Sequence, residues 1–346
     1  MKEKKKTTIS DIARATGYSK TTVSFAFNSP SRISVEAREK ILSVAKSLDY
    51  TPDPMARNFS LGRHKSIGFL LPQSLADSLS NPYTQSVLRG IGIVAEQNDN
   101  TLTIIPPVHS SISEAINNAT VDGLISMGLW FDPQIRESLR RRKLPLVLID
   151  GADEDGPINL SIDDLSAAYE AMKAVLERGH RKIAIISLPF DAYAQLTPQE
   201  TKTIVRRRQA GYEKALSEYS MSLSDLTMVS CPATFQDGAR VANEFFSSGD
   251  YTCIVCMSDV VALGVMDSAR AKGMNIPSDI SIVGFDGIFS TYSSGLCLTT
   301  VVQDAEKKGI MSAELLFKVL DGEEVESHQN FPFEFRIGNT LKEINK

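Results

Sequence analysis

The segment from Ser19 to Pro30, SKTTVSFAFNSP, gathers side chains that can hydrogen-bond to another molecule. It carries one lysine, five hydroxyl residues and two phenylalanines. At the helical spacing of about 100° per residue, Val23, Ala26 and Phe27 form one apolar stripe. The opposite side presents polar groups and one aromatic ring, namely Lys20, Thr21, Ser24, Phe25 and Asn28. The segment is therefore either a core helix or a helix that reads a partner with its polar side.

Two further short helices are predicted around this segment. Ser19 can cap the helix because its hydroxyl accepts from amides two or three residues on, and Pro30 forbids extension. The preceding stretch ISDIARATG predicts a helix that ends at Gly17, so the two helices form a helix-turn-helix. A third helix is capped by Ser34, and its predicted apolar side consists of Val35, Ile41, Leu42, Ala45 and Leu48.

The charge of the chain is divided unequally. Residues 1–65 hold 13 Lys/Arg and 6 Asp/Glu, a net of +7, whereas residues 66–346 hold 24 and 36, a net of −12. A basic head on an acidic body indicates that only the head meets a polyanion. The charge alone favours a solvated basic surface over such a partner.

The length and composition favour two or three folded domains. The chain has 346 residues, of which 42% are hydrophobic and 23% charged, which allows sizeable cores. No apolar run approaches the roughly 18 residues of a membrane span. The opening MKEKKK is followed by no apolar signal-peptide region. We expect a cytoplasmic protein without a membrane partner.

The four cysteines favour structural thiols in a reducing compartment. Cys231 and Cys297 are isolated, and Cys253 and Cys256 form a CIVC inside the apolar run YTCIVCM. On a strand, residues an odd number apart point to opposite faces, so this pair cannot easily hold a metal. We expect no metal site and no cofactor.

A linker, TPDPMARNFSLGRHK, follows the third helix. Asp53 can cap a helix that has Pro54 at its first position and runs to about Ser60. Isolated helices below roughly 12 residues do not hold in water. This helix should therefore need a partner to fold.

From Lys65 onward, apolar runs alternate with amphipathic helical patterns. Continuous apolar strands alternating with helices indicate parallel sheets covered on both faces. With at least seven such strands, two doubly wound halves are favoured over one sheet, and facing strand ends would form a ligand cleft. The strand candidates are SIGFLLP, TLTIIPP, DGLISMG, LPLVLID, KIAIISLP, YTCIVCM and ISIVGFD.

The order and spacing of these segments strongly resemble the lac repressor (LacI/GalR) family of bacterial transcription regulators. The resemblance covers nearly the whole chain, from TTISDIARATGYSKTTVSFAFNSP through NPYTQSVLRGI, LPLVLIDG and RRRQAGYEKAL to DISIVGFD and LTTVVQDAEKKG. It implies a DNA-binding helix-turn-helix, a hinge helix and an effector domain of periplasmic-binding-protein type, working as a dimer. The expected fold class is α/β, with a three-helix head and two lobes of parallel doubly wound sheets.

The resemblance places SKTTVSFAFN at the recognition helix, whose N-terminal side chains enter the major groove. Lys20 and Thr21 fall where the family reads base edges, and Arg32 could add a phosphate or a base contact. Lysine can donate to guanine O6 and N7, and hydroxyls suit phosphate oxygens. The positions at which the family commonly holds phosphates are Ser19, Thr22, Ser24, Asn28 and Ser34.

Phe25 departs from the family pattern, in which many members carry arginine at this place. A phenyl ring cannot make the bidentate guanine contact, but it can pack on a thymine methyl. We therefore predict an operator with a different base there. The alternative is that Phe25 folds against Tyr18 or the linker and reads nothing.

The linker segment DPMARNF matches the family's hinge helix, where paired helices enter the minor groove and a leucine wedges between base pairs. Phe59 stands at the leucine position, and Arg57 would lie beside it near the phosphates. Phenylalanine is among the side chains that unstack a base step. The alternative is that Phe59 packs on the effector domain.

The resemblance also implies an effector site at strand ends in the cleft. Carboxylates and a guanidinium suit vicinal hydroxyls through paired hydrogen bonds, so a sugar or polyol is the favoured effector. Family members also bind nucleobases, and Ser258 stands where asparagine is common, so the identity of the effector is open. The implied effector residues are Tyr83, Asp150, Arg208, Ser258 and Asp286.

Neighbours of these residues have structural interpretations. Arg206 and Arg207 are expected to be solvated helix residues. Asp259 is expected to cap the helix that follows it. His180, just after a helix-ending glycine, is expected to satisfy carbonyl groups rather than a ligand.

Two other classes of protein, an enzyme and a plain solute-binding protein, fit the sequence less well than a regulator. An enzyme is disfavoured because the four histidines sit in no nucleophile or metal spacing, and GxSxG, GxGxxG and Walker A motifs are missing. We name no catalytic residue. A plain solute-binding protein is disfavoured by the basic head and the missing signal peptide.

The expected protein is a ligand-responsive, sequence-specific DNA-binding regulator, favoured as a repressor. The expected division is a DNA-binding domain at 1–50, a hinge helix and linker at 51–64, and an effector and dimerisation domain at 65–346. The chain ends at RIGNTLKEINK without a heptad segment, so a homodimer on a palindromic operator is expected. On DNA it would associate with the nucleoid. Whether effector releases the protein or recruits it stays open.

Overall fold

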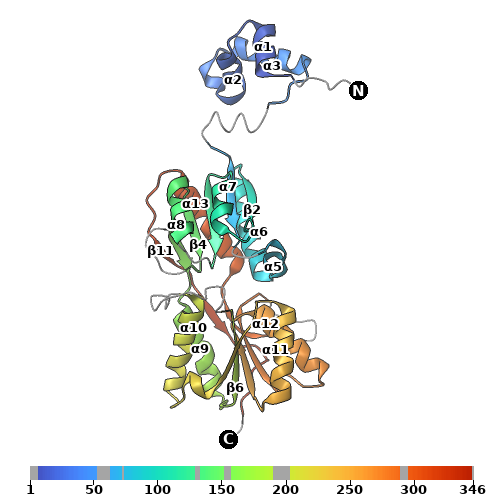
Figure 1. Cartoon of the computed structure of the whole chain (residues 1–346), viewed down its shortest axis with the longest axis vertical. Helices are drawn as coiled ribbons and strands as arrows, with labels where there is room; N and C mark the ends of the chain where they lie inside the picture. The colour runs from blue at the N-terminus through green and yellow to red at the C-terminus, as the bar shows by residue number, and fades with distance from the viewer. Residues whose placement is uncertain are drawn as a thin grey trace. The chain divides into compact units, whose positions relative to one another are not determined.

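The protein is described by a computed structural model that covers residues 7–52, 63–71, 74–128, 133–151, 157–189, 203–288 and 295–344 (Figure 1). The chain divides into two compact units, Met1–Lys65 and Ser66–Lys346. The predicted hinge helix, with Arg57 and Phe59, lies outside the described residues.

The N-terminal unit contains the three predicted helices. Gly17 takes a left-handed φ of 79° and ends the first helix. The hydroxyls of Ser19 and Ser34 accept backbone N–H groups at the starts of the second and third helices. The elements are α1 (Ile9–Thr16), α2 (Lys20–Asn28), the 3-10 turn η1 (Pro30–Arg32) and α3 (Val35–Ser47).

A small apolar core holds these helices together. Val23 and Ala26 of α2 are buried in it, which confirms the predicted apolar stripe of this helix. The prediction for α3 is wrong at its two ends, since Val35 is 74% exposed and Leu48 is 37% exposed. The buried residues of α3 recur every fourth position, so the stripe is narrower than predicted. They are Ala37, Ile41 and Ala45.

The C-terminal unit contains two separate sheets, as predicted, and each sheet has six strands. Their strand orders are β2-β1-β3-β4-β5-β11 and β7-β6-β8-β9-β10-β12, and we call the two halves lobe 1 and lobe 2. Every pairing is parallel except that of β10 with β12. The strands of lobe 1 are β1 (Ser66–Leu70), β2 (Thr101–Ile105), β3 (Gly123–Met127), β4 (Leu146–Ile149), β5 (Ile158–Ser161) and β11 (His328–Asn330). Those of lobe 2 are β6 (Ile183–Ser187), β7 (Thr227–Ser230), β8 (Cys253–Cys256), β9 (Ser281–Asp286), β10 (Thr299–Val302) and β12 (Glu334–Arg336).

Helices cover both faces of each sheet. In lobe 2, the pair α9 and α10 lies on one side of β6 and the pair α11 and α12 on the other (Figure 1). None of the described helices is both long and apolar enough to cross a lipid bilayer. The helices of this unit are α5 (Leu75–Ser80), α6 (Pro82–Gln97), α7 (Ile112–Asn118), α8 (Pro133–Arg142), α9 (Asp164–Glu177), α10 (Ile204–Ser217), η4 (Leu223–Asp225), α11 (Phe235–Ser248), α12 (Asp259–Ala271) and α13 (Ala305–Leu320).

The chain passes between the lobes three times. The first crossing leads from β5 to α9, the second from β10 to α13, and the third from β11 to β12. The second crossing is unusual because α13 packs on β3 and β4 of lobe 1, although the strand before it belongs to lobe 2. Side chains in this connection can therefore touch both halves.

Strand β8 confirms the prediction for the cysteine pair. Cys253 belongs to one apolar cluster and Cys256 to another, on opposite faces of the sheet. All four cysteines are free thiols, and burial raises the pKa of Cys231 to about 11. Among the described residues, no group of His, Cys, Asp and Glu side chains is arranged to hold a metal ion.

Helices α6 and α13 approach each other through glycines. A Cβ atom on Gly90 would lie 2.1 Å from the Glu306 carbonyl oxygen, and one on Gly309 would lie 2.2 Å from that of Val87. Real Cβ atoms do not come so close to backbone, so this helix pair depends on both glycines. Gly92, one half-turn along α6, faces open space.

We predict that Gly90→Ala destabilises the protein by about 1–3 kcal/mol or more, because the added methyl forces α6 and α13 apart. Gly92→Ala should instead stabilise it by about 0.4–1 kcal/mol, since alanine restricts the unfolded chain without a clash. Urea unfolding of both variants and the wild type measures the difference. Equal midpoints for the two variants would contradict the close approach.

Candidate functional site

Each lobe places an Asp-Gly pair at the end of a central strand. Asp150 follows β4 and Asp286 ends β9, and each is followed by glycine. Asp150 has a φ of 53° and Asp286 a φ of 125°, a region that residues with a Cβ seldom adopt. Such backbone persists only where its surroundings hold it, and it concentrates at functional sites.

Buried polar side chains hold both strand ends. In lobe 1, the Asn159 amide accepts from Gly151 N at 3.0 Å and donates to Gly151 O at 3.3 Å. In lobe 2, the Asp259 carboxylate accepts from Gly287 N at 2.7 Å and from the Thr300 hydroxyl at 2.6 Å. The prediction that Asp259 caps its own helix is therefore wrong, because its oxygens serve the turn after β9. Burial and the charge of Asp286 raise the pKa of Asp259.

A fully buried lysine joins the two Asp-Gly ends. Lys308 Nζ donates to both carboxylate oxygens of Asp150, at 2.6 and 2.7 Å, and to Gln303 Oε1 at 2.5 Å. Gln303 Nε2 donates in turn to Asp286 Oδ1 at 2.9 Å. Gln303 lies in the second crossing and Lys308 on the first turn of α13. A continuous line of hydrogen bonds therefore runs from lobe 1 to lobe 2.

Two predicted effector residues terminate this line. Tyr83, at the start of α6, donates its hydroxyl to Asp150 Oδ2 at 3.1 Å. Ser258, before α12, donates to Asp286 Oδ2 at 2.9 Å. Burial raises the pKa of Tyr83, and the charges of Asp150 and Asp286 raise it further. Burial also raises the pKa of Asp286.

Arg208 is the fifth predicted effector residue and lies beside the line. Its Nε donates to Asp164 Oδ1 at 2.9 Å, its Nη1 donates to the Met257 carbonyl at 2.7 Å, and its guanidinium lies 3.5 Å from the centroid of the Phe285 ring. Burial lowers the pKa of Arg208, but the charges of Asp164 and Asp286 outweigh it, so the pKa is raised. The structure thus brings all five residues into one region.

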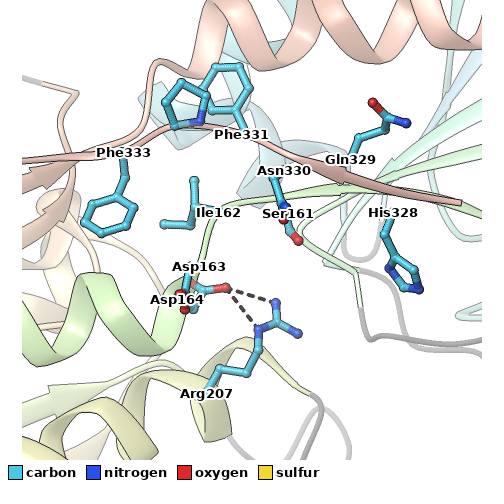
Figure 2. A pocket seen from close by; sticks show the side chains of 11 residues that line it. Ser161, Ile162, Asp163, Asp164, Arg207, His328, Gln329, Asn330, Phe331 and Phe333 are labelled. Carbon is cyan, nitrogen blue, oxygen red and sulfur yellow. Dashed lines mark hydrogen bonds and ion pairs between the residues drawn. The ribbon is translucent and has the colours of Figure 1, made fainter. Parts of the chain in front are cut away.

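The prediction that Arg207 is a solvated residue is wrong. Its side chain is only 16% exposed, and it donates to Asp164 Oδ2 at 2.9 Å and to the Gly151 carbonyl at 3.3 Å. A cavity of about 580 Å³ lies next to it, between the first and third crossings. Figure 2 shows Arg207 reaching Asp164 on one side of this cavity, with the rings of Phe331 and Phe333 on the segment opposite.

Two other structural predictions are confirmed. Arg206 is exposed on α10. His180 is fully buried, with Nε2 3.1 Å from the Lys342 carbonyl oxygen and Nδ1 2.9 Å from the Thr252 hydroxyl. Burial lowers the pKa of His180.

The sequence does not indicate the residues that form the buried ion pairs and hydrogen bonds with the predicted effector residues. Lys308 stands in the polar string DAEKKG, which suggests an exposed surface, although it falls in phase with the buried Ser312 and Leu316 of α13. That helical phase was the available signal. The missed residues are Asp164, Arg207, Gln303 and Lys308.

The N-terminal unit presents the predicted reading residues on and around α2. Lys20 and Thr21 are exposed on its first turn, and Phe25, one turn further, is half-buried. Among the described residues, the recorded ring contact of Phe25 is with Arg32, whose guanidinium lies 5.4 Å from the ring centroid. The predicted phosphate-binding side chains form local hydrogen bonds in this structure. Ser19 bonds to Thr22, Asn28 donates to Ser24, and Ser34 caps α3.

Comparisons with known protein families match both units. Residues 8–53 match the bacterial regulatory proteins of the lacI family, and residues 172–340 match a periplasmic binding protein-like domain. The transcriptional regulator IpsA of Corynebacterium glutamicum is 32% identical over 97% of this chain and 98% of its own. The transcriptional repressor CytR of Escherichia coli is 28% identical over 94% of both chains.

Solved structures share the fold over most or nearly all of the chain. A LacI-family transcriptional regulator from Corynebacterium glutamicum is 28% identical, has a TM-score of 0.71, and aligns over 96% of this chain and 98% of its own. The lac repressor dimer bound to operator and an anti-inducer is 22% identical, with a TM-score of 0.77 over 98% of this chain and 100% of its own. A LacI-family regulator from Enterococcus faecium with bound ribose is 22% identical, with a TM-score of 0.68 over 81% of this chain and 100% of its own.

We predict that Lys308→Met costs about 3–5 kcal/mol of stability, because it leaves the buried Asp150 carboxylate without its counter-charge. Adding Asp150→Asn to this variant should recover much of the loss. Lys307→Met is the matched control, since Lys307 is 74% exposed, and should change stability by about 0.5 kcal/mol or less. Urea unfolding of the full chain measures all four proteins. Equal losses for the two lysine variants would contradict the buried pair.

Proposed function

The chain belongs to the lacI family of bacterial regulatory proteins, and from this premise we propose that it represses transcription by binding a palindromic operator as a homodimer. The observation that carries the proposal is the two-sided helix α2, which buries Val23 and Ala26 and exposes Lys20 and Thr21. A recognition helix needs buried residues that anchor it and exposed side chains that can reach base edges. The similarity to a protein named as a repressor supports the sign of regulation.

We propose that Lys20 and Thr21 read base edges and that the hydroxyl and amide side chains around them hold phosphates. The net charge of +7 in residues 1–65 supports binding to a polyanion in the cytoplasm. The operator is expected to be palindromic because a two-fold dimer presents two identical heads. The linker at 51–64, with Arg57 and Phe59, is assigned to the minor groove on the family pattern alone.

For the effector, we propose an uncharged sugar or polyol bound beside the Asp150–Lys308–Gln303–Asp286 line. Among the described residues there, each of three cations already has a carboxylate partner before any ligand arrives: Arg207 and Arg208 pair with Asp164, and Lys308 pairs with Asp150. A charged ligand would compete with these ion pairs, whereas hydroxyl groups can add to free lone pairs without doing so. The ribose bound to the Enterococcus faecium regulator supports this class of effector.

The proposed mechanism is linkage between this site and the head. An effector that binds the two lobes differently in two arrangements shifts the equilibrium between them by its difference in affinity. The second crossing transmits such a shift because Gln303 and Lys308 contact both lobes. The arrangement of the lobes then decides whether paired hinge helices form on DNA.

Selection of bound sequences from random DNA, repeated with sugars, polyols and nucleosides, tests the whole proposal. The expected result is one palindrome whose recovery changes with one neutral compound and falls steeply with salt. Recovery of no sequence at low salt with every compound would overturn DNA reading and favour a plain binding protein. A charged compound as effector would contradict the ion-pair argument alone.

We predict that Phe25→Arg changes which operator is preferred rather than abolishing binding. Arginine can make a bidentate contact with guanine, whereas a phenyl ring offers apolar contact to a thymine methyl. The same selection experiment, performed with the variant, measures the change in base preference. An unchanged preference would mean that residue 25 does not take part in readout.

A further inference from the structure

Arg32 is held at a fixed place next to the recognition helix. Ser29 N donates to the Phe25 carbonyl at 3.0 Å and ends α2, and Arg32 N donates to the Ser29 carbonyl at 3.0 Å within the turn η1. On the other side of Arg32, Ile33 packs against the core of the head and Ser34 caps α3. The backbone of this exposed residue is therefore anchored on both sides.

The Arg32 side chain lies over the ring of Phe25. The distance of 5.4 Å from Cζ to the ring centroid is within the range of a cation–π contact. Within the described part of the chain, this is the interaction recorded for the Arg32 guanidinium, and no carboxylate or carbonyl occupies its N–H donors. The group is thus positioned by an aromatic face while its donors stay free.

We propose that Arg32, supported on Phe25, reads a guanine in the major groove. A phosphate contact needs only a positive charge nearby, but a bidentate contact to guanine O6 and N7 needs a guanidinium plane with a set orientation. The Phe25 ring supplies that orientation and reduces the freedom that a long exposed side chain would lose on binding. Phe25 lies one helical turn beyond Thr21, so the supported guanidinium adjoins the exposed first turn of α2.

The proposal rests on the proposed function, since it assigns a base to a head that binds DNA. It gives Phe25 a positioning role, in addition to any contact of its ring with a thymine methyl. It also separates Arg32 from the phosphate-binding residues of the head. Many family members carry the arginine at position 25 itself. Here the guanidinium belongs to Arg32, and the aromatic ring of Phe25 supports it.

The test is selection from random DNA with the full chain as wild type and as the variants Arg32→Ala, Arg32→Lys, Phe25→Leu and Phe25→Tyr. Arg32→Ala should lower the preference for guanine at one base pair of each half-site by about 10- to 100-fold. Arg32→Lys should lower it less than Arg32→Ala does, because a lysine ammonium can donate to O6 and N7 but lacks the rigid planar fork of the guanidinium. Phe25→Leu should weaken the preference at the same base pair, and Phe25→Tyr should retain it.

Arg14→Ala is the matched control, because it removes the same charge from an 81% exposed side chain elsewhere on the head. It should leave every base preference unchanged. The proposal is overturned if Arg32→Ala weakens binding equally for all sequences, or if Arg32→Lys keeps the guanine preference at its full wild-type value. Loss of preference at different base pairs in the Arg32 and Phe25 variants would also overturn it. If the wild type selects no sequence, the proposed function itself fails, which is a separate result.

Discussion

The C-terminal unit depends on one buried positive charge. Removing an ammonium from water costs several kcal/mol unless acceptors replace the lost hydration. Three acceptor oxygens surround Lys308 Nζ, two from Asp150 at the end of β4 and one from Gln303 in the second crossing. Satisfying this single charge therefore ties a strand end of lobe 1 to a connection that starts in lobe 2.

The same constraint explains the close packing of α6 and α13. Helix α6 carries both Tyr83 and Gly90, and α13 carries both Lys308 and Gly309. The glycines allow the two backbones to approach, and this approach lets the side chains of Tyr83 and Lys308 reach the same Asp150 carboxylate. A helix contact in the lobe core thus sets the geometry of the polar groups at its edge.

The sequence predicted what depends on local patterns and missed what depends on distant partners. The seven continuous apolar runs became strands, and Asp150 and Asp286 lie where those runs end. Strand β11 has the sequence HQN, which carries no apolar signal, and it forms only because β5 offers an edge. Lys308 lies 158 residues from Asp150 in the chain, and adjacent lysines in a polar string suggest an exposed surface. The pairing of its charge is a property of the fold, not of the local sequence.

The positively charged side chains of the two units differ in how far they are exposed to solvent and salt. Lys20 and Arg32 stay exposed, so their attraction to a polyanion is screened by salt. Lys308 Nζ and the Nε and Nη1 atoms of Arg208 donate hydrogen bonds inside the C-terminal unit, where screening is weak. The net charge of a segment does not distinguish exposed cations from buried ones, whereas the burial of each side chain does. We therefore expect ionic strength to act mainly on the head. In the proposed linkage mechanism, a signal from the effector would reach the head as a change of conformation rather than as an electrostatic field.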